Sequence, residues 1–215
     1  MELFVATRNR NKVRELTALL HETALTLLSY RDFKDLPTII EDGATMRENA
    51  ITKATVLAKH TKLLTIADDS GLEVDALGGR PGVMSARYSG LEATDRENNE
   101  KLLAELKGVP DEKRTARFRC VIALATPGEL VAVVEGVCEG RIATQERGSK
   151  GFGYDPLFVK EEYTKTFAEL PLDIKNRVSH RALALEKALM AIEDYLMRRH
   201  KNPQSPQGPS PGAQP

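Results

Sequence analysis

The chain has 215 residues, which fits one large domain or a two-lobed one. Lys plus Arg equals Asp plus Glu at 31 each, so the net charge is zero, which argues against a general nucleic-acid binder with a basic surface but allows a local basic pocket. The chain starts without a basic segment and long apolar core, and it holds no uncharged run of roughly 18 residues; we therefore expect neither signal peptide nor membrane span. Two cysteines without metal-ligand spacing fit a reduced, cytoplasmic protein.

The first loop of the chain is rich in cations. Residues 3–6 predict a strand, and leucines at helical spacing over residues 16–20 predict a helix that Asn9 or Asn11 could cap. Between strand and helix lie Thr7, Arg8, Asn9, Arg10, Asn11 and Lys12. Cations at a helix start oppose the helix dipole unless an anion is bound there. We interpret this segment as a phosphate-binding loop, with solvated surface charges as the alternative.

A second strand and a polar-faced helix follow. Residues 25–29 predict the strand, and an acidic turn containing Glu41 leads to a helix expected at about residues 45–59. Asn49 and Lys53 are four residues apart and therefore share one side of this helix. If that side lines a cleft, Lys53 can reach a phosphate; an exposed lysine is the commoner arrangement.

The most acidic motif is Asp68-Asp69-Ser70-Gly71. We expect a short buried strand over residues 63–67 with both carboxylates at its end, where ligands usually bind in an α/β sheet. Adjacent carboxylates repel, and a divalent cation would offset them, since Mg²⁺ favours one or two carboxylates together with substrate phosphates. The alternative is a solvated acidic turn.

The second half of the chain predicts antiparallel strands. A capping box from Thr94 to Glu97 opens a helix. The elements expected here are this helix, to about residue 107, a hairpin of strands at 116–125 and 130–137, and short strands at 140–143 and 157–160. Because hairpins are antiparallel, we expect an α/β fold with a mixed sheet. Residues 201–215 hold five of the eleven prolines and predict a disordered tail.

Two further motifs carry chemistry. The glycine-rich loop around Phe152 and Tyr154 lets the backbone approach a ligand, and it offers two aromatic rings beside the acceptor Asp155. Alternatively, its aromatic rings pack into the core. Ser179 predicts the cap of a last helix, and the cations His180 and Arg181 occupy its first turn, close in sequence to Lys175. We interpret this group as an anion and base site.

These residues suggest a Mg²⁺–nucleotide site. The set combines cations (Lys12, Lys53, Lys175, Arg181), carboxylates (Glu41, Asp68, Asp69) and residues that could contact a base (Phe152, Asp155, His180). Pattern and spacing do not choose the bond that is cleaved. The alternatives are a nucleotide-binding regulator without catalysis, a phosphohydrolase that releases orthophosphate, and a nucleic-acid binder, which the zero net charge disfavours.

Six ordered motifs resemble one known family. They are Ala6-Thr7-x-Asn9-x-x-Lys12, Glu48-Asn49-Ala50-x-x-Lys53-Ala54, Ala67-Asp68-Asp69-Ser70-Gly71-Leu72, Gly82-x-x-Ser85-Ala86-Arg87-Tyr88, Gly151-Phe152-Gly153-Tyr154-Asp155-Pro156 and Ser179-His180-Arg181. The chain resembles, over about residues 1–197, the Ham1/RdgB/inosine triphosphatase family of nucleoside-triphosphate pyrophosphatases. Arg8 and Arg10 depart from the family pattern.

The resemblance implies a fold and a reaction. The fold would be a long, mixed central sheet flanked by helices, with two lobes and a cleft between them, in a single unit over residues 1–200. The protein would form a homodimer, without nucleic acid or membrane as partner. It would hydrolyse dITP, ITP or XTP to the monophosphate and pyrophosphate, with Mg²⁺ as cofactor.

The resemblance also implies roles for individual residues. Glu41 and Asp69 would hold Mg²⁺, and Asp69 would activate the attacking water, with Asp68 as the other candidate base. The substrate would be bound by the first loop, Thr7, Arg8, Asn9, Arg10, Asn11 and Lys12, and by Lys53, Ser70, Phe152, Gly153, Tyr154, Asp155, Lys175, His180 and Arg181. A donor aimed at the 6-oxygen of the base would reject adenine, because unpaired buried polar groups are costly.

Overall fold

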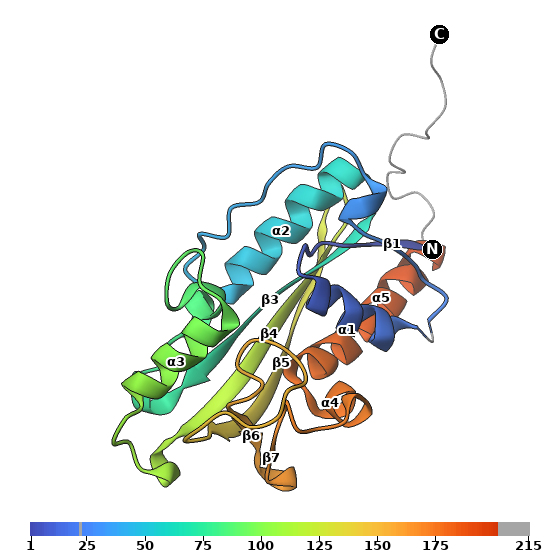
Figure 1. Cartoon of the computed structure of the whole chain (residues 1–215). Helices are drawn as coiled ribbons and strands as arrows, with labels where there is room; N and C mark the ends of the chain where they lie inside the picture. Colours follow the sequence, from blue (N-terminus) through green and yellow to red (C-terminus); the bar gives the residue numbers. More distant parts are fainter. Residues whose placement is uncertain (22, 202–215) are drawn as a thin grey trace.

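The computed structural model describes residues 1–21 and 23–201 (Figure 1). The helices and strands are, in chain order, β1 (Glu2–Val5), α1 (Arg10–Leu20), β2 (Thr26–Leu28), α2 (Met46–Thr61), β3 (Leu64–Val74), α3 (Asp95–Glu105), β4 (Thr115–Ala125), β5 (Leu130–Ile142), β6 (Phe158–Lys160), β7 (Lys165–Thr166), α4 (Leu172–Val178) and α5 (His180–Lys201). Short 3₁₀ turns, among them η3 (Gly82–Arg87), link these elements. The predicted tail lies outside the described residues except for Lys201, which ends α5.

All seven strands form one mixed sheet in the order β2-β1-β3-β4-β5-β6-β7. β1 pairs in parallel with β2 and β3, whereas every pair from β3 to β7 is antiparallel. The predicted mixed α/β sheet is therefore confirmed. The separate strand expected at residues 140–143 is wrong, because β5 continues without a break to Ile142.

Helices cover both faces of the sheet (Figure 1). α1 and α5 pack on one face, where Leu16 and Leu185 join a core with Cys120 of β4. α2 packs on the other face through Ala50 and Leu57, as its spacing predicted. A third core cluster, which includes Leu72 and Phe118, lies between the far end of the sheet and α3. The three long strands β3, β4 and β5 thus contribute residues to all three cores.

The position of the acidic pair differs from the prediction. We expected a strand that ends at residue 67, but β3 runs from Leu64 to Val74, and Asp68 and Asp69 pair with Ile122 and Val121 in its middle. Successive side chains of a strand point to opposite faces. The two carboxylates therefore do not share one site. Asp68 points towards α1 and α5, and Asp69 points towards α2.

One edge of β3 is left open beside this pair. The last residue of β1, Val5, pairs with Ile66, and within the described ranges no strand covers β3 from Ala67 to Leu72 on this side. The backbone there accepts side-chain donors instead: the ammonium group of Lys53 donates to the carbonyl of Asp68 at 3.0 Å. A short β1 next to a long β3 therefore creates the place where a ligand can reach the sheet.

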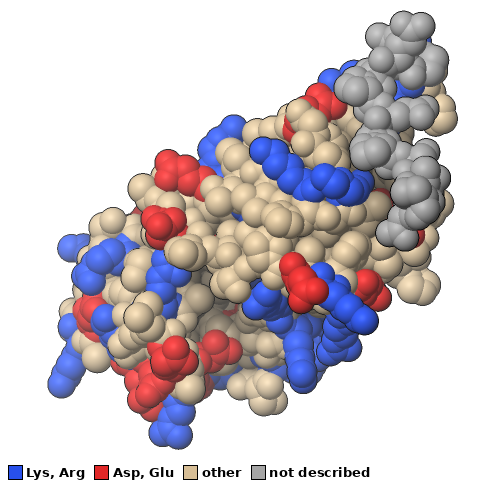
Figure 2. Space-filling view, turned by 90° about the horizontal axis from the view of Figure 1, so that it is seen from above, with Lys and Arg blue, Asp and Glu red and all other residues tan. Residues whose placement is uncertain are grey.

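No helix in residues 1–21 and 23–201 is both long and apolar enough to cross a lipid bilayer. The face of the molecule seen in Figure 2 mixes Lys and Arg with Asp and Glu, and its positive side chains form no continuous band. This mixture agrees with the zero net charge.

We predict that Gly136→Ala in β5 destabilises the protein by about 2–3 kcal/mol, the upper range for overpacking. A methyl group there would clash with the backbone carbonyl of His180 and the backbone amide of Ala184, so α5 would have to move. The free energy of unfolding in urea measures the effect. Gly128→Ala in the hairpin turn is the matched control, because its methyl group meets no atom within 4 Å. Equal stability of the two variants would show that α5 does not pack this closely on β5.

Candidate active site

A cleft of about 380 Å³ opens beside the free edge of β3. It is lined by fifteen of the predicted site residues, Thr7, Arg8, Asn9, Glu41, Lys12, Lys53, Asp69, Ser70, Phe152, Gly153, Tyr154, Asp155, Lys175, His180 and Arg181. Arg10 and Asn11 do not line it. Arg10 is exposed on the first turn of α1, and the side chain of Asn11 accepts a hydrogen bond from Arg14 on the same helix. The structure thus brings most of the predicted residues together, from six separate segments.

The start of α1 forms one end of the cleft. Asn9 caps the helix, because its side-chain oxygen accepts from the backbone N–H groups of Asn11 and Lys12 at 2.9 and 3.2 Å. The first turn contains no acidic residue to offset the helix dipole. Arg8 stands over the ring of Tyr30, 4.7 Å from its centroid. The positive end of the α1 dipole is therefore not neutralised by an acidic side chain in its first turn, and it can attract an anion at this end of the cleft.

Asp69 faces the cleft from the open edge of β3. One oxygen accepts from the amide of Asn49 at 3.0 Å, and the other from the backbone N–H of Ser70 at 2.9 Å. Burial raises the pKa of Asp69, while the nearby Lys12 and Lys53 oppose that rise only in part. The predicted position of Lys53 on a cleft-facing side of α2, next to Asn49, is confirmed.

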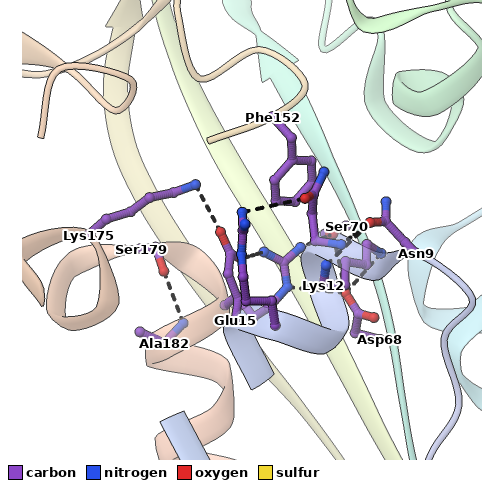
Figure 3. Close-up of polar contacts among 12 residues, drawn as sticks. Asn9, Lys12, Glu15, Asp68, Ser70, Phe152, Lys175, Ser179 and Ala182 are labelled. Carbon is purple, nitrogen blue, oxygen red and sulfur yellow. Dashed lines mark hydrogen bonds and ion pairs between the residues drawn. The ribbon is translucent and has the colours of Figure 1, made fainter. Parts of the chain in front are cut away.

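Asp68 has a different environment. It is 1 % exposed, does not line the cleft, and pairs with Lys12 at 2.9 Å and Arg181 at 3.4 Å (Figure 3). Burial alone would raise its pKa, but Lys12, Arg181 and Lys53 together hold the pKa of Asp68 well below its usual range. Asp68 is therefore a permanent anion that orients cations. It is poorly suited to accept a proton, whereas Asp69 is suited to do so.

Glu41 is the second carboxylate, besides Asp69, that could hold a metal ion, and it lines the same cleft. Its carboxylate pairs with Lys53 at 2.9 Å, and its backbone carbonyl accepts from the guanidinium of Arg87 at 2.9 Å. The negative charge of Glu41 is also close enough to contribute to the raised pKa of Asp69. Within the described part of the chain, no three His, Cys, Asp or Glu side chains gather as a complete metal cage. Two carboxylates facing one cleft fit Mg²⁺, which takes its other ligands from water and substrate phosphates.

The other end of the cleft carries an aromatic ring over cations. The ammonium group of Lys175 lies 5.2 Å from the ring centroid of Phe152, and the guanidinium carbon of Arg181 lies 5.7 Å from it. Asp155 pairs with Lys175 at 2.5 Å and accepts from the backbone N–H of Phe152 at 2.9 Å. Burial raises the pKa of Asp155, against the opposing charge of Lys175.

The two aromatic residues of this loop behave differently. Phe152 is half-buried and faces the cleft, as the ligand-binding interpretation requires. Tyr154 is buried in the third core cluster, and its hydroxyl donates to the backbone carbonyl of Ser85 at 2.9 Å. The alternative that aromatic rings of this loop pack into the core therefore holds for Tyr154, although part of the residue still lines the cleft.

Glu15 was not predicted from the sequence as a site residue, and it joins α1 to two cations at the aromatic end of the cleft. It is buried in α1 and pairs with Lys175 at 2.9 Å and with Arg181 (Figure 3). Burial opposes its charge, but Arg181 and Lys175 hold the pKa of Glu15 below its usual value. A signal was present, because Glu15 is three residues after Lys12 and four before Leu19, which places all three on the inward stripe of the helix.

His180 is a buried, neutral base at the start of α5. Its ring stacks on Phe118 with centroids 4.7 Å apart, and its Nδ1 atom has no hydrogen-bond partner in the described structure. Burial, together with the charges of Arg181 and Lys175, holds the pKa of His180 well below its usual value of 6.5. Ser179 caps this helix as predicted, since its hydroxyl accepts from the backbone N–H of Ala182 at 3.2 Å.

We predict that His180 makes the protein sensitive to mild acid. Its folded pKa is lowered, so below pH 6.5 the unfolded chain binds a proton that the folded protein does not, and stability present above pH 6.5 is lost as the pH falls. Between pH 7.5 and 5.5, this loss is at most about 1.4 kcal/mol, the value for a folded histidine that binds no proton in this range.

Urea unfolding at both pH values checks this prediction. His180→Gln should lose less stability than the parent protein, by up to about 1.4 kcal/mol. His60→Gln, which removes an exposed histidine of α2, is the control and should behave like the parent. The same pH dependence in all three proteins would contradict a neutral buried His180.

Comparison with known proteins places this site in a family. A protein named dITP/XTP pyrophosphatase from Geobacter sulfurreducens is 54% identical over 90% of this chain and 96% of its own length. One of the same name from Bacillus subtilis is 49% identical over 89% of this chain and 97% of its own length.

Solved structures of similar proteins indicate the same family. A HAM1 protein from Coxiella burnetii matches with a TM-score of 0.82 and 41% identity, over 90% of this chain and 99% of its own. A nucleoside-triphosphatase, or dITP/XTP pyrophosphatase, from Mycobacterium abscessus matches with a TM-score of 0.72 and 46% identity, over 88% of this chain and 99% of its own. The model of the Ham1 family matches residues 3–191. The chain therefore belongs to the Ham1 family.

Proposed function

We propose that the protein hydrolyses the deaminated purine nucleoside triphosphates dITP, ITP and XTP to the monophosphate and pyrophosphate. One observation carries this proposal: a single cleft joins a cationic helix start and a proton-accepting carboxylate at one end to an aromatic ring over buried cations at the other. The relatives named dITP/XTP pyrophosphatase support the same reaction. Removing such nucleotides would keep them out of DNA and RNA.

The reaction would take place at the phosphate end of the cleft. A water molecule attacks the α-phosphorus, the bond from that phosphorus to the bridging oxygen breaks, and pyrophosphate leaves. Asp69 takes the water proton, because its carboxylate lines the cleft, whereas Asp68 does not line it and is paired with Lys12 and Arg181. Lys12 and Lys53 line the cleft and oppose the negative charge that grows on the leaving pyrophosphate.

Magnesium belongs to this proposal as the cofactor. Glu41 and Asp69 would hold the ion, because both carboxylates face the cleft and the set of oxygen donors is the kind that Mg²⁺ prefers. When bound, Mg²⁺ would neutralise phosphate charge and favour in-line geometry. Arg87 would keep Glu41 in place through its hydrogen bond to the Glu41 backbone.

Selectivity for a 6-keto purine would come from the aromatic end. The base would stack on Phe152, and donors of Lys175, His180 or the loop backbone would meet its 6-oxygen. Adenine presents an amino group at that position, so a buried donor would be left unpaired. Arg181 already bonds Glu15, Asp68 and Ser70, so most of its donors serve the protein itself.

We predict that the protein converts dITP to dIMP and pyrophosphate in the presence of Mg²⁺ and loses this activity with a chelator, while dATP and dGTP are nearly untouched.

Asp69→Asn keeps the shape of the side chain but removes the proton acceptor, and it should lower kcat by about 10²–10⁴-fold. Chromatography that separates dIMP from dIDP, and pyrophosphate from orthophosphate, reads the result.

The matched control for this experiment is Asp75→Asn, which changes an exposed carboxylate near the far end of β3. It should leave kcat unchanged. Formation of dIDP and orthophosphate would identify cleavage at the γ-phosphate and overturn the proposed reaction. Binding of dITP without turnover would favour the regulatory alternative.

The proposal also includes a cytoplasmic homodimer, as the family resemblance implies. Size-exclusion chromatography with light scattering should give about twice the chain mass of 23.7 kDa at micromolar concentration. A mass that stays at 23.7 kDa over the accessible concentration range would reject the dimer without affecting the proposed reaction.

A further inference from the structure

Two residues of α3 hydrogen-bond to Gly153 in the aromatic loop, the loop of residues 151–156 that carries Phe152. The carboxylate of Asp95 accepts from the backbone N–H of Gly153 at 2.7 Å, and the amide of Asn99 donates to the backbone carbonyl of Gly153 at 3.2 Å. Asp95 and Asn99 are four residues apart, so they lie on the same side of α3. Both polar groups of one backbone residue are therefore held by one helix.

Gly153 directly follows Phe152, whose ring faces the cleft. The φ angles of Gly151 and Gly153 are +79° and +60°, in the region that glycine adopts without strain. Glycines on both sides give Phe152 little local stiffness. Inside the loop, the backbone N–H of Phe152 donates to Asp155 at 2.9 Å. Contacts from α3 reach the loop at the next residue, Gly153.

The side-chain amide of Asn99 donates both of its hydrogen bonds to the segment that contains the loop. Asn99 is 3 % exposed, and the same amide also donates to Glu146 at 2.8 Å, just before the loop. A buried amide costs free energy unless it is hydrogen-bonded, and here both of its donor bonds join α3 to the segment that carries Phe152. Asp95 lines the cleft beside the loop.

We infer that Asp95 and Asn99 are positioning residues for the base, which hold Gly153 so that Phe152 stays packed against Lys175 and Arg181. Loss of either anchor frees the ring from its cations, while Asp69 and Lys12 at the other end of the cleft keep their contacts. Binding should therefore weaken more than chemistry slows. The kinetic part of this inference rests on the proposed function, whereas the geometric part does not.

The geometric part can be tested without substrate. The chain contains no tryptophan, so Phe152→Trp introduces the only tryptophan, at the ring position, and its emission can be excited apart from that of the tyrosines. Acrylamide quenching of this Trp should increase at least twofold when Asp95→Ala or Asn99→Ala is added, because the loop then moves more freely. Unchanged quenching in both double variants would overturn the inference.

Glu97→Ala is the matched control. Glu97 is also an acidic residue in the first turn of α3, but its side chain bonds only Thr94, in the capping box. Its removal weakens the helix start to a similar degree and leaves Gly153 alone. Added to Phe152→Trp, Glu97→Ala should leave quenching at the value of Phe152→Trp alone. An increase equal to that of Asp95→Ala would show that any damage to α3 has this effect, and would overturn a specific role of Asp95.

The kinetic test uses the parent Phe152. Asp95→Ala and Asn99→Ala should raise KM for dITP about tenfold with kcat within twofold, and Asp95→Asn, which keeps an acceptor oxygen for Gly153, should restore most of the affinity. Circular dichroism confirms that each variant is folded. A fall in kcat without a change in KM would overturn the positioning role. Absence of dITP hydrolysis in the parent protein would reject the proposed function instead, and the quenching result would then decide the inference alone.

Discussion

The structure depends on one buried chain of alternating charges. Carboxylates and cations follow each other in the order Asp155, Lys175, Glu15, Arg181, Asp68 and Lys12, and each is joined to the next by an ion pair. Each buried charge would be costly alone, and removal of one partner from such a pair typically costs 3–5 kcal/mol. The six residues come from β3, α1, α4, α5 and the aromatic loop. Correct folding therefore requires these five segments to meet. Four of the six residues, Lys12, Asp155, Lys175 and Arg181, also line the cleft.

The short β1 gives this charge chain its access to ligand. Because β1 stops opposite Ile66, the middle of β3 keeps an open edge, and the strand alternation places Asp68 and Asp69 on opposite sides of it. One aspartate can then serve the buried ion network while its neighbour serves the cleft. The pKa values of the two carboxyl groups move in opposite directions for this reason, as expected where two titratable groups take different roles.

The sequence alone predicts those parts of the structure that local rules control. The spacing of α2, the cap of α1 at Asn9, the capping box of α3 and the hairpin of β4 and β5 all follow from propensity and periodicity. The extent of β3 does not, because polar residues from Asp68 to Gly71 interrupt the apolar run, and pairing with β4 carries the strand through them. Glu15 was missed for a similar reason: its partners Lys175 and Arg181 lie about 160 residues away in the chain, so nothing near it in sequence shows that a buried charge is paired.

The partners of the two cleft lysines connect this architecture to the proposed reaction. Lys53 pairs with Glu41 and Lys12 pairs with Asp68. A triphosphate that takes over both lysines leaves Asp68 with Arg181, which is buried beside it, but it leaves Glu41 without a cation. Glu41 and Asp69 would then face the same phosphates as unpaired anions, and this arrangement is unfavourable unless a divalent cation accompanies the substrate. The asymmetry between the two lysines thus gives a reason for the proposed metal site at Glu41 and Asp69 and for none at Asp68, whose charge is balanced by Arg181.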